Sequence, residues 1–317
     1  MTAERILVLG GGPDSEREVS LVSSQAVADA LTAAGCRVRR EVVDRIDAPA
    51  IRALNADAVF PVLHGPWGEG GPLQDVLRDA GVPFVGCDAP AARLAMDKMA
   101  TKLAAAGAGV PTLPACVLNE RDPAPPLPLP VVVKPIHEGS SVGVSICRDM
   151  AGWEEALRRV ASDRAQHPLR TYMVERAAIG ARELTVGWLD GRTLPIVEIK
   201  PGVEFYDYEA KYNRDDTRYE CDPKLPGDIA DRVKAFALAT AKAAGVRHLA
   251  RVDFLLDADN KPWLLEVNTM PGFTGHSLFP MAAAHAGIPF PQLAATLVRL
   301  ALRDAGRSFT PAPAQGR

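Results

Sequence analysis

The sequence lacks the features of a secreted or membrane-bound protein. Its five cysteines, Cys36, Cys87, Cys116, Cys147 and Cys221, are far apart and form no C-x-x-C pair, which predicts free thiols in a reducing compartment. No apolar run approaches the 18 residues that a membrane-spanning helix needs. The opening segment MTAERILVLGGG is interrupted by glycine too early for a signal peptide. We therefore expect a cytoplasmic protein with no membrane partner.

The chain also lacks a strong charge of either sign. Its net charge of −3 gives no broad attraction to nucleic acid, so no nucleic-acid partner is expected. The six histidines show no metal-type spacing, which argues against structural zinc. With 317 residues, 47% of them apolar, the chain is long enough to bury a core in two or three domains.

The order of expected elements predicts an α/β fold followed by α+β parts. Strands alternate with helices over residues 1–95, which predicts a mostly parallel sheet. Residues 96–180 open with a helix and continue with strands around a Pro-rich loop. Residues 181–317 begin with two strands joined at Asp190-Gly191, a strong hairpin signal. The long polar and aromatic stretch at about 203–220 is predicted to be a lid.

Two glycine-rich segments are candidate phosphate sites. Gly10, Gly11 and Gly12 stand between a strand and a helix but match the dinucleotide fingerprint only in part, and a plain tight turn explains them about as well. The second segment, KPIHEGSSVGVS at 134–145, follows the apolar run LPVVV and is not a Walker A loop. Its backbone amides and serines suit a phosphate, but a hairpin turn explains the segment equally well.

Acidic side chains interrupt two apolar strands near the C-terminus. Asp253 stands in the first strand, and Glu266 and Asn268 stand two apart in the second, so they share one face. Oxygen ligands of this kind suit Mg²⁺. An ion pair to Arg251 is the alternative, but it accounts for only one of the acids, so we favour the metal site.

The combination of metal ligands with a Gly/Ser loop flanked by lysines resembles the ATP-grasp enzymes. Over nearly its whole length the chain is similar to the D-alanine–D-alanine ligase family. Nine segments match in the family's order: GGPDSEREVS, VLHGPWGEGGPLQ, AMDK, VVVKPIHEGSSVGVS, RELTVGWLDG, FYDYEAKY, RVDF, LLEVNTMPGFTGHSL and FPMAAAHAG. The resemblance implies a three-domain ATP-grasp architecture, with an N-terminal substrate domain and two domains that clamp ATP.

The resemblance also implies roles for individual residues. ATP binding falls to Lys98, Lys134, Glu138, Gly139, Ser141, Val142, Glu175, Arg176, Ala178, Glu183 and Lys211. The two D-alanine sites fall to Glu16, His64, Tyr206, Lys211, Arg251, Gly272, Ser277 and Leu278. The resemblance implies that Asp253, Glu266 and Asn268 bind two Mg²⁺ ions, which Mn²⁺ can replace. The catalytic set comprises Glu16, Ser140, Tyr212, Arg251 and Gly272, with Glu16, Ser140 and Tyr212 as a hydrogen-bonded triad.

The implied reaction joins two D-alanines at the cost of ATP, through an acyl phosphate, for peptidoglycan synthesis. A homodimer is expected because the family commonly forms one. Another ATP-grasp ligase, a D-alanyl-D-lactate ligase and a non-enzymatic nucleotide-binding protein remain alternatives. The chain departs from the family pattern at Gly70, where Asp is usual, and at Arg176, where Lys is common; its Pro-rich linker is also shorter.

Overall fold

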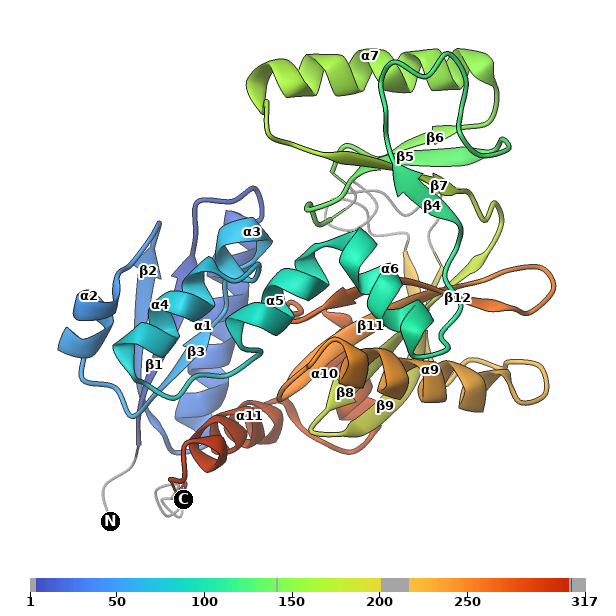
Figure 1. Ribbon diagram of the computed structural model, residues 1–317. Coiled ribbons are helices and arrows are strands. Elements are labelled where there is room, and N and C mark those ends of the chain that lie inside the picture. The colour runs from blue at the N-terminus through green and yellow to red at the C-terminus, as the bar shows by residue number, and fades with distance from the viewer. Residues whose placement is uncertain (1–3, 141, 201–216, 308, 310–317) are drawn as a thin grey trace.

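The structure is a computed structural model that describes residues 4–140, 142–200, 217–307 and 309. These residues form three β-sheets with helices packed on them (Figure 1). Within the described ranges, no helix has both the length and the apolar character needed to cross a lipid bilayer.

The first sheet is parallel, as the alternating pattern predicted. Its strands β1 (Arg5–Gly11), β2 (Arg37–Val43) and β3 (Ala58–Pro61) lie in the order β2-β1-β3. Helix α1 (Arg17–Ala33) packs on β1 and β2. The shorter helices that follow are α2 (Ala48–Ala53), α3 (Gly65–Gly68), α4 (Pro72–Ala80) and α5 (Ala89–Met96).

The glycines at the end of β1 allow α1 to approach the strand closely. A Cβ at Gly10 would lie 2.1 Å from the Ser24 hydroxyl, so only glycine fits there. The amide of Gly11 donates to Ser20 Oγ at 2.8 Å, and the amide of Gly12 donates to the Val43 carbonyl at 2.7 Å. Because protein atoms already occupy these amides, the first glycine segment acts as a packing turn, and the phosphate interpretation of it is disfavoured.

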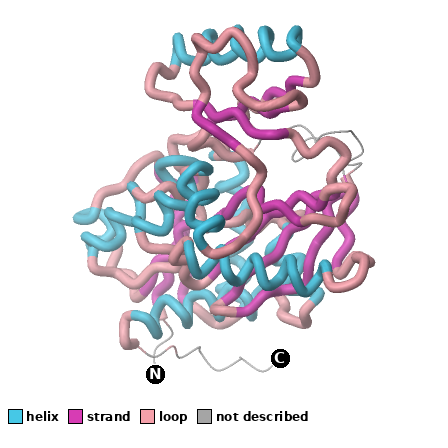
Figure 2. The backbone as a smooth tube through the Cα atoms, turned by 45° about the vertical axis from the view of Figure 1, so that its right-hand side comes forward, coloured by secondary structure: helices cyan, strands magenta, loops and turns pink. Residues whose placement is uncertain are grey.

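The second sheet is antiparallel and forms the top of the molecule with helix α7 (Met150–Gln166) in both backbone views (Figures 1 and 2). Its order is β4-β7-β5-β6. The strands are β4 (Ala115–Val117), β5 (Val131–Pro135), β6 (Ser145–Cys147) and β7 (Tyr172–Arg176). Strands β5 and β6 pair directly, so the Gly/Ser segment between them connects a hairpin.

The third sheet is antiparallel, with the order β10-β9-β8-β11-β12. Strands β8 (Arg182–Leu189) and β9 (Arg192–Lys200) meet at Asp190-Gly191, which confirms the predicted hairpin. The other strands are β10 (Arg218–Cys221), β11 (Leu249–Leu256) and β12 (Pro262–Asn268). Its helices are α9 (Ile229–Ala243) and α10 (Leu278–His285). Residues 201–216, most of the predicted lid, lie outside the described residues.

The division at 95/96 and 180/181 stays a proposal, and two helices bear on it. Helix α6 (Lys98–Gly107), which opens the second predicted unit, packs against β12 and α9 of the third sheet. Helix α11 (Phe290–Asp304), at the end of the chain, packs against α1 and β3 of the first. Chain order and spatial grouping therefore differ for both helices.

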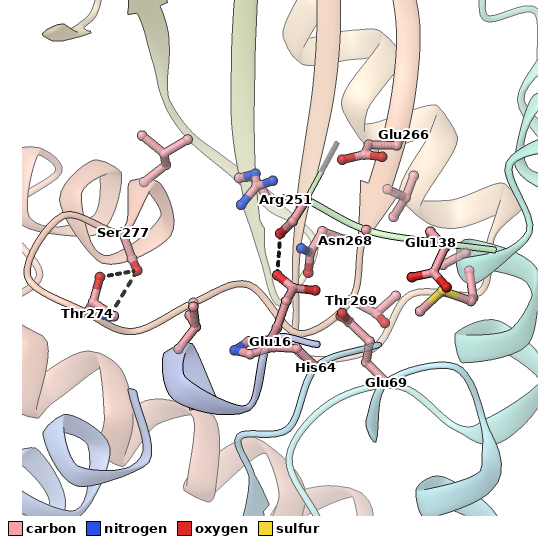
Figure 3. Close-up of a pocket in the computed structure, with 18 of the residues that line it drawn as sticks. Glu16, His64, Glu69, Glu138, Arg251, Glu266, Asn268, Thr269, Thr274 and Ser277 are labelled. Atoms are coloured by element: carbon pink, nitrogen blue, oxygen red, sulfur yellow. Dashed lines mark hydrogen bonds between the residues drawn. The ribbon is translucent and has the colours of Figure 1, made fainter. Parts of the chain in front are cut away.

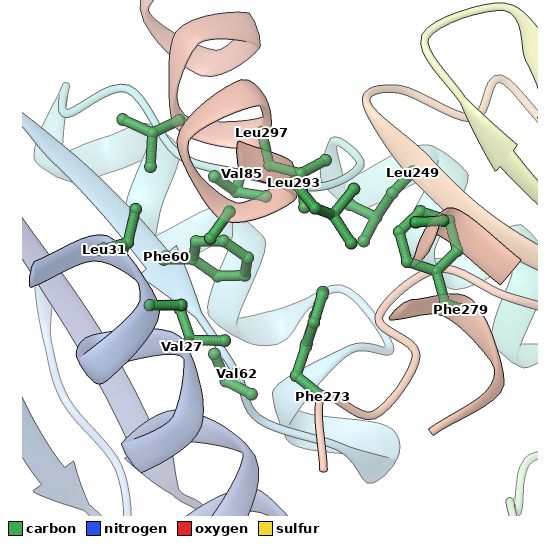
Figure 4. Close-up of a cluster of buried hydrophobic side chains, with 14 of the residues drawn as sticks. Val27, Leu31, Phe60, Val62, Val85, Leu249, Phe273, Phe279, Leu293 and Leu297 are labelled. Atoms are coloured by element: carbon green, nitrogen blue, oxygen red, sulfur yellow. The ribbon is translucent and has the colours of Figure 1, made fainter. Parts of the chain in front are cut away.

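One large apolar core joins the first and third sheets (Figure 4). Phe273 lies at its centre, with its ring 5.4 Å from that of Phe60 and 6.0 Å from that of Phe290. Burying one such side chain contributes about 1.5–3 kcal/mol. Since Phe273 directly follows Gly272, this core holds a candidate site loop in place.

A buried histidine before β11 makes hydrogen bonds to the segment between α4 and α5 and to the end of α11. His248, only 1% exposed, accepts from the Gly86 amide through Nδ1 and lies 3.0 Å from Asp304 through Nε2. An imidazole that accepts at one nitrogen and donates at the other is neutral. Burial is the main cause that lowers the pKa of His248 from 6.5 to about 4, with nearby Arg247 adding to the effect.

We expect this histidine to make stability fall in acid. The unfolded chain gains a proton at His248 below about pH 6.5, and the folded chain resists that proton down to about pH 4. The contribution of His248 to the free energy of unfolding is therefore fully present above pH 6.5. It is lost as the pH falls from about 6.5 to about 4, by about 3 kcal/mol in total. Urea unfolding at pH 7.5 and pH 4.5 measures it.

His248→Asn removes the titrating group and keeps an acceptor for the Gly86 amide. The difference in unfolding free energy between the two pH values is expected to shrink clearly in this variant. Equal differences in the two proteins would contradict the assignment.

Candidate active site

A cavity lies where the three sheets meet, and most predicted substrate and catalytic residues line it (Figure 3). The predicted residues on its wall are Glu16, His64, Lys98, Glu138, Gly139, Ser140, Glu183, Arg251, Glu266, Asn268, Gly272, Ser277 and Leu278. A neighbouring cavity shares Lys98, Glu138, Gly139, Glu183 and Glu266 with it and adds Lys134, Val142, Glu175, Arg176 and Ala178. Ser141, Tyr206, Lys211 and Tyr212 lie outside the described residues.

A hydrogen bond between the first helix and the Gly/Ser loop crosses the cavity. Ser140 Oγ donates to Glu16 Oε1, across 124 positions of sequence. Glu16 stands directly before α1, and Ser140 has a left-handed backbone with φ of 50°. A Cβ at Gly139 would lie 3.0 Å from the Glu16 carboxylate. Two members of the predicted triad therefore meet.

The start of the Gly/Ser loop is held by cations. The Glu138 carboxylate is 2.6 Å from Arg170 Nη2, and its backbone carbonyl accepts from Lys98 Nζ. Arg170 also binds Asp163 at 2.6 Å. The Glu138 side chain thus anchors the loop to the segment before β7, a contact that the sequence did not predict.

At the wall of the second cavity, the buried carboxylate of Glu175 pairs with two buried lysines. Lys134 Nζ on β5 donates to Glu175 Oε2 on β7 at 2.6 Å, and Lys102 on α6 forms an ion pair with Glu175 Oε1. The sequence analysis missed Lys102. The sequence feature that could have indicated Lys102 is its position one helical turn after Lys98 in an alanine-rich helix.

The predicted metal ligands lie on paired strands. Asp253 on β11 is opposite Glu266 on β12, and Arg251 is opposite Asn268. Arg251 Nη2 is 2.8 Å from Asp253 Oδ2, and Thr185 Oγ1 donates to Asp253 Oδ1 at 2.5 Å. The ion pair that was the alternative interpretation is therefore present.

The three predicted metal ligands offer the kind of oxygen atoms that Mg²⁺ prefers. Glu266 and Asn268 line the first cavity, while Asp253 is 2% exposed and lines neither of the two cavities. Among the described residues, no three His, Cys, Asp or Glu side chains form a metal-type cluster. The donors are instead two carboxylates and an amide oxygen, a hard oxygen set of the kind that Mg²⁺ takes together with water and phosphate oxygens.

Two buried ionisable side chains face Glu16 from the loop after β3. Burial lowers the pKa of His64, and its Nε2 makes no hydrogen bond to any other described residue. Burial, helped by the charge of Glu16, raises the pKa of Glu69 to about 8. The sequence analysis did not single out Glu69, although it stands in the GEGG segment whose Gly70 departs from the family.

The structure gives a steric reason for glycine, in place of the family's usual Asp, at position 70. A Cβ there would lie 2.4 Å from the Pro66 carbonyl oxygen, so the usual Asp would force the backbone to move.

The loop after β12 presents Gly272 and Ser277 to the first cavity. Ser277 Oγ accepts from the Thr274 amide at 2.9 Å (Figure 3), and the Phe273 amide donates to Ser23 Oγ at 3.1 Å. A Cβ at Gly272 would lie 2.8 Å from Ser277 Oγ. The loop is thus tied to α1 on one side and to the start of α10 on the other.

Comparison with known proteins gives consistent matches along the chain. Family models described as "D-ala D-ala ligase N-terminus" and "D-ala D-ala ligase C-terminus" match residues 39–87 and 120–299. A D-alanine–D-alanine ligase from Anaeromyxobacter sp. is 40% identical over 92% of this chain and 95% of its own length. One from Methylacidiphilum infernorum is 38% identical over 93% and 94%.

Solved structures agree. A D-alanine–D-alanine ligase from Bacillus anthracis superposes with a TM-score of 0.83 at 31% identity, covering 96% of this chain and 99% of its own. The same enzyme complexed with ATP gives 0.81 at 30% identity, with the same coverage. Since one family model spans more than half of the sequence and the relatives cover nearly all of it, the chain belongs to the D-alanine–D-alanine ligase family.

Proposed function

We propose that this chain joins two D-alanine molecules into D-alanyl-D-alanine, with conversion of ATP to ADP and phosphate, as a step of peptidoglycan precursor synthesis. The observation that carries the proposal is the contact between Glu16 and Ser140 in a cavity shared with Arg251, Glu266 and Asn268. It brings a carboxylate for an amino acid, a phosphate-type loop and an oxygen ligand set together in one space.

The nucleotide occupies the second cavity in this proposal. Leu113, Val132, Leu255 and Leu265 provide apolar walls for a flat base. The Glu175 carboxylate accepts from the adenine amino group, the backbone near Ala178 contacts the ring, and Glu183 binds the ribose. Lys98, Lys134 and the loop from Glu138 to Val142 bind the phosphates, with Arg176 beside the base and Lys211 closing from the lid.

The amino acids occupy the first cavity. Glu16 binds the ammonium of the first D-alanine, next to Nε2 of His64. Ser277 and Leu278 hold the carboxylate of the second, and Tyr206 and Lys211 close over both. Tyr212 completes the triad with Ser140 and Glu16.

Asp253, Glu266 and Asn268 hold two Mg²⁺ ions in this proposal, with Mn²⁺ as a substitute. Mg²⁺, when bound, supplies charge neutralisation at the phosphates. The reaction then has two steps. The carboxylate oxygen of the first D-alanine attacks the γ-phosphorus, and ADP leaves. The neutral amine of the second D-alanine attacks the acyl carbon, the C–O bond to phosphate breaks, and the proton lost from the nitrogen leaves with the phosphate. Arg251 and the Gly272 amide stabilise the oxyanion that forms when the amine attacks and that lasts until phosphate leaves.

The proposal also includes a cytoplasmic location and a homodimer. The five cysteines are free in the structure, which suits a reducing compartment.

Product analysis tests the reaction itself. With ATP, Mg²⁺ and D-alanine we expect ADP, phosphate and D-alanyl-D-alanine, and no phosphate above background with L-alanine. With excess D-lactate added, mass spectrometry is expected to find the dipeptide as the main product near neutral pH, because an amine is a better nucleophile than a hydroxyl. Substantial D-alanyl-D-lactate would overturn the choice of second substrate.

Glu266→Gln tests the metal site. The change is nearly isosteric, so circular dichroism is expected to match the unmodified protein, while ADP release falls at least a hundredfold because one charged ligand is lost. Glu154→Gln, at an exposed position on α7, is the matched control and should keep full activity. A folded Glu266→Gln protein with near-normal ADP release would rule out the ligand role.

Glu16→Gln tests the first amino-acid site. Loss of a charge-assisted hydrogen bond to an ammonium costs about 1.5–3 kcal/mol, so the KM for D-alanine should rise strongly. Glu18→Gln, on the exposed side of the same helix, should leave it unchanged. Unaltered KM values for both D-alanine sites in Glu16→Gln would show that this role is wrong.

A further inference from the structure

A buried lysine lies directly behind the proposed adenine site. Lys102 is 5% exposed, lines neither of the two cavities described above, and donates from Nζ to the Leu113 carbonyl at 3.1 Å. Its ammonium also pairs with Glu175. Because α6 packs on the third sheet whereas Glu175 belongs to the second, this ion pair crosses the joint between the two sheets that enclose the second cavity.

The cluster holds one more positive than negative charge. Burial alone raises the pKa of Glu175, but the ammonium groups of Lys134 and Lys102 outweigh it and hold that pKa below its usual value. Burial lowers the pKa of Lys102, and Glu175 opposes this effect. Each charge therefore depends on the others, since an unpaired buried ion is strongly destabilised.

The two lysines differ in what they can reach. Lys134 lines the second cavity, so a nucleotide phosphate can draw its ammonium away from Glu175. Lys102 donates to the Leu113 carbonyl and is not among the residues that line the cavity. Once Lys134 binds phosphate, Lys102 is the cation that remains on Glu175 in this cluster.

We propose that Lys102 is a positioning residue that keeps Glu175 an anion aimed into the cavity, and that it thereby selects a 6-amino purine over a 6-oxo purine. An ionised carboxylate only accepts hydrogen bonds, so it pairs with an amino group and repels a carbonyl oxygen; a protonated carboxyl donates and tolerates the carbonyl. The inference rests on the proposed use of ATP.

The test compares ATP with inosine triphosphate, which carries a 6-oxo group, as phosphoryl donors for D-alanine ligation. Lys102→Met is expected to raise the KM for ATP about tenfold with a smaller change in kcat, since a charge-assisted hydrogen bond is about twice as strong as a neutral one. The ratio of the KM for inosine triphosphate to that for ATP should fall by a similar factor.

A double-mutant cycle separates this role from a structural one. In a Glu175→Gln background the acceptor charge is already absent, so Lys102→Met should leave the KM ratio unchanged. Lys242→Met, the same substitution at an exposed lysine on α9, should leave both KM values unchanged. Lys102→Gln, which still donates to the Leu113 carbonyl, is measured in parallel so that poor folding of Lys102→Met does not decide the outcome.

A normal KM ratio in a folded Lys102 variant would overturn the inference, as would an equal change of that ratio with and without the Glu175 carboxylate. If the unmodified chain makes no ADP from ATP and D-alanine, the proposed function fails instead. The two failures are therefore distinct.

Discussion

The hydrogen bond from Ser140 to Glu16 is the contact on which the arrangement of the site depends. Glu16 is placed by α1, which packs on β1 through small residues and glycine. Ser140 is placed by a hairpin loop whose start is anchored through Glu138 to Arg170. This contact links the start of α1 on the first sheet to the β5–β6 loop of the second, and in the proposed function it joins the amino-acid and nucleotide sites.

Charged groups in the site are buried in mutual pairs, and this has a consequence for ligand binding. Lys134 is paired with Glu175, and Arg251 with Asp253. Each pair satisfies charges that would be costly to bury alone. Under the proposed function a ligand must replace one partner of each pair, so phosphate competes with Glu175 for Lys134. The affinity for the nucleotide then depends on how much stronger the contact of Lys134 with phosphate is than its contact with Glu175.

Local patterns in the sequence predicted the elements well where a turn signal was clear. Asp190-Gly191 predicted the β8–β9 hairpin, and the alternation over the first 95 residues predicted a parallel sheet. The short helices α5 and α10 and the strand β4 were not foreseen, because elements of eight and three residues are too short for a repeating pattern to stand out. The sheets against which α6 and α11 pack were not predicted, because periodicity shows that a helix has an apolar face but not which sheet covers it.

The sequence by itself indicated the family, the two acids and the asparagine on paired strands, and the acid at the start of α1, because these depend on residue type and local spacing. Only the tertiary structure decided that Lys102 reaches Glu175 and that Glu69 is buried beside Glu16. These contacts join residues far apart in the chain or set their solvent exposure. Both are properties of packing, and packing of distant segments leaves no periodic trace in a single sequence.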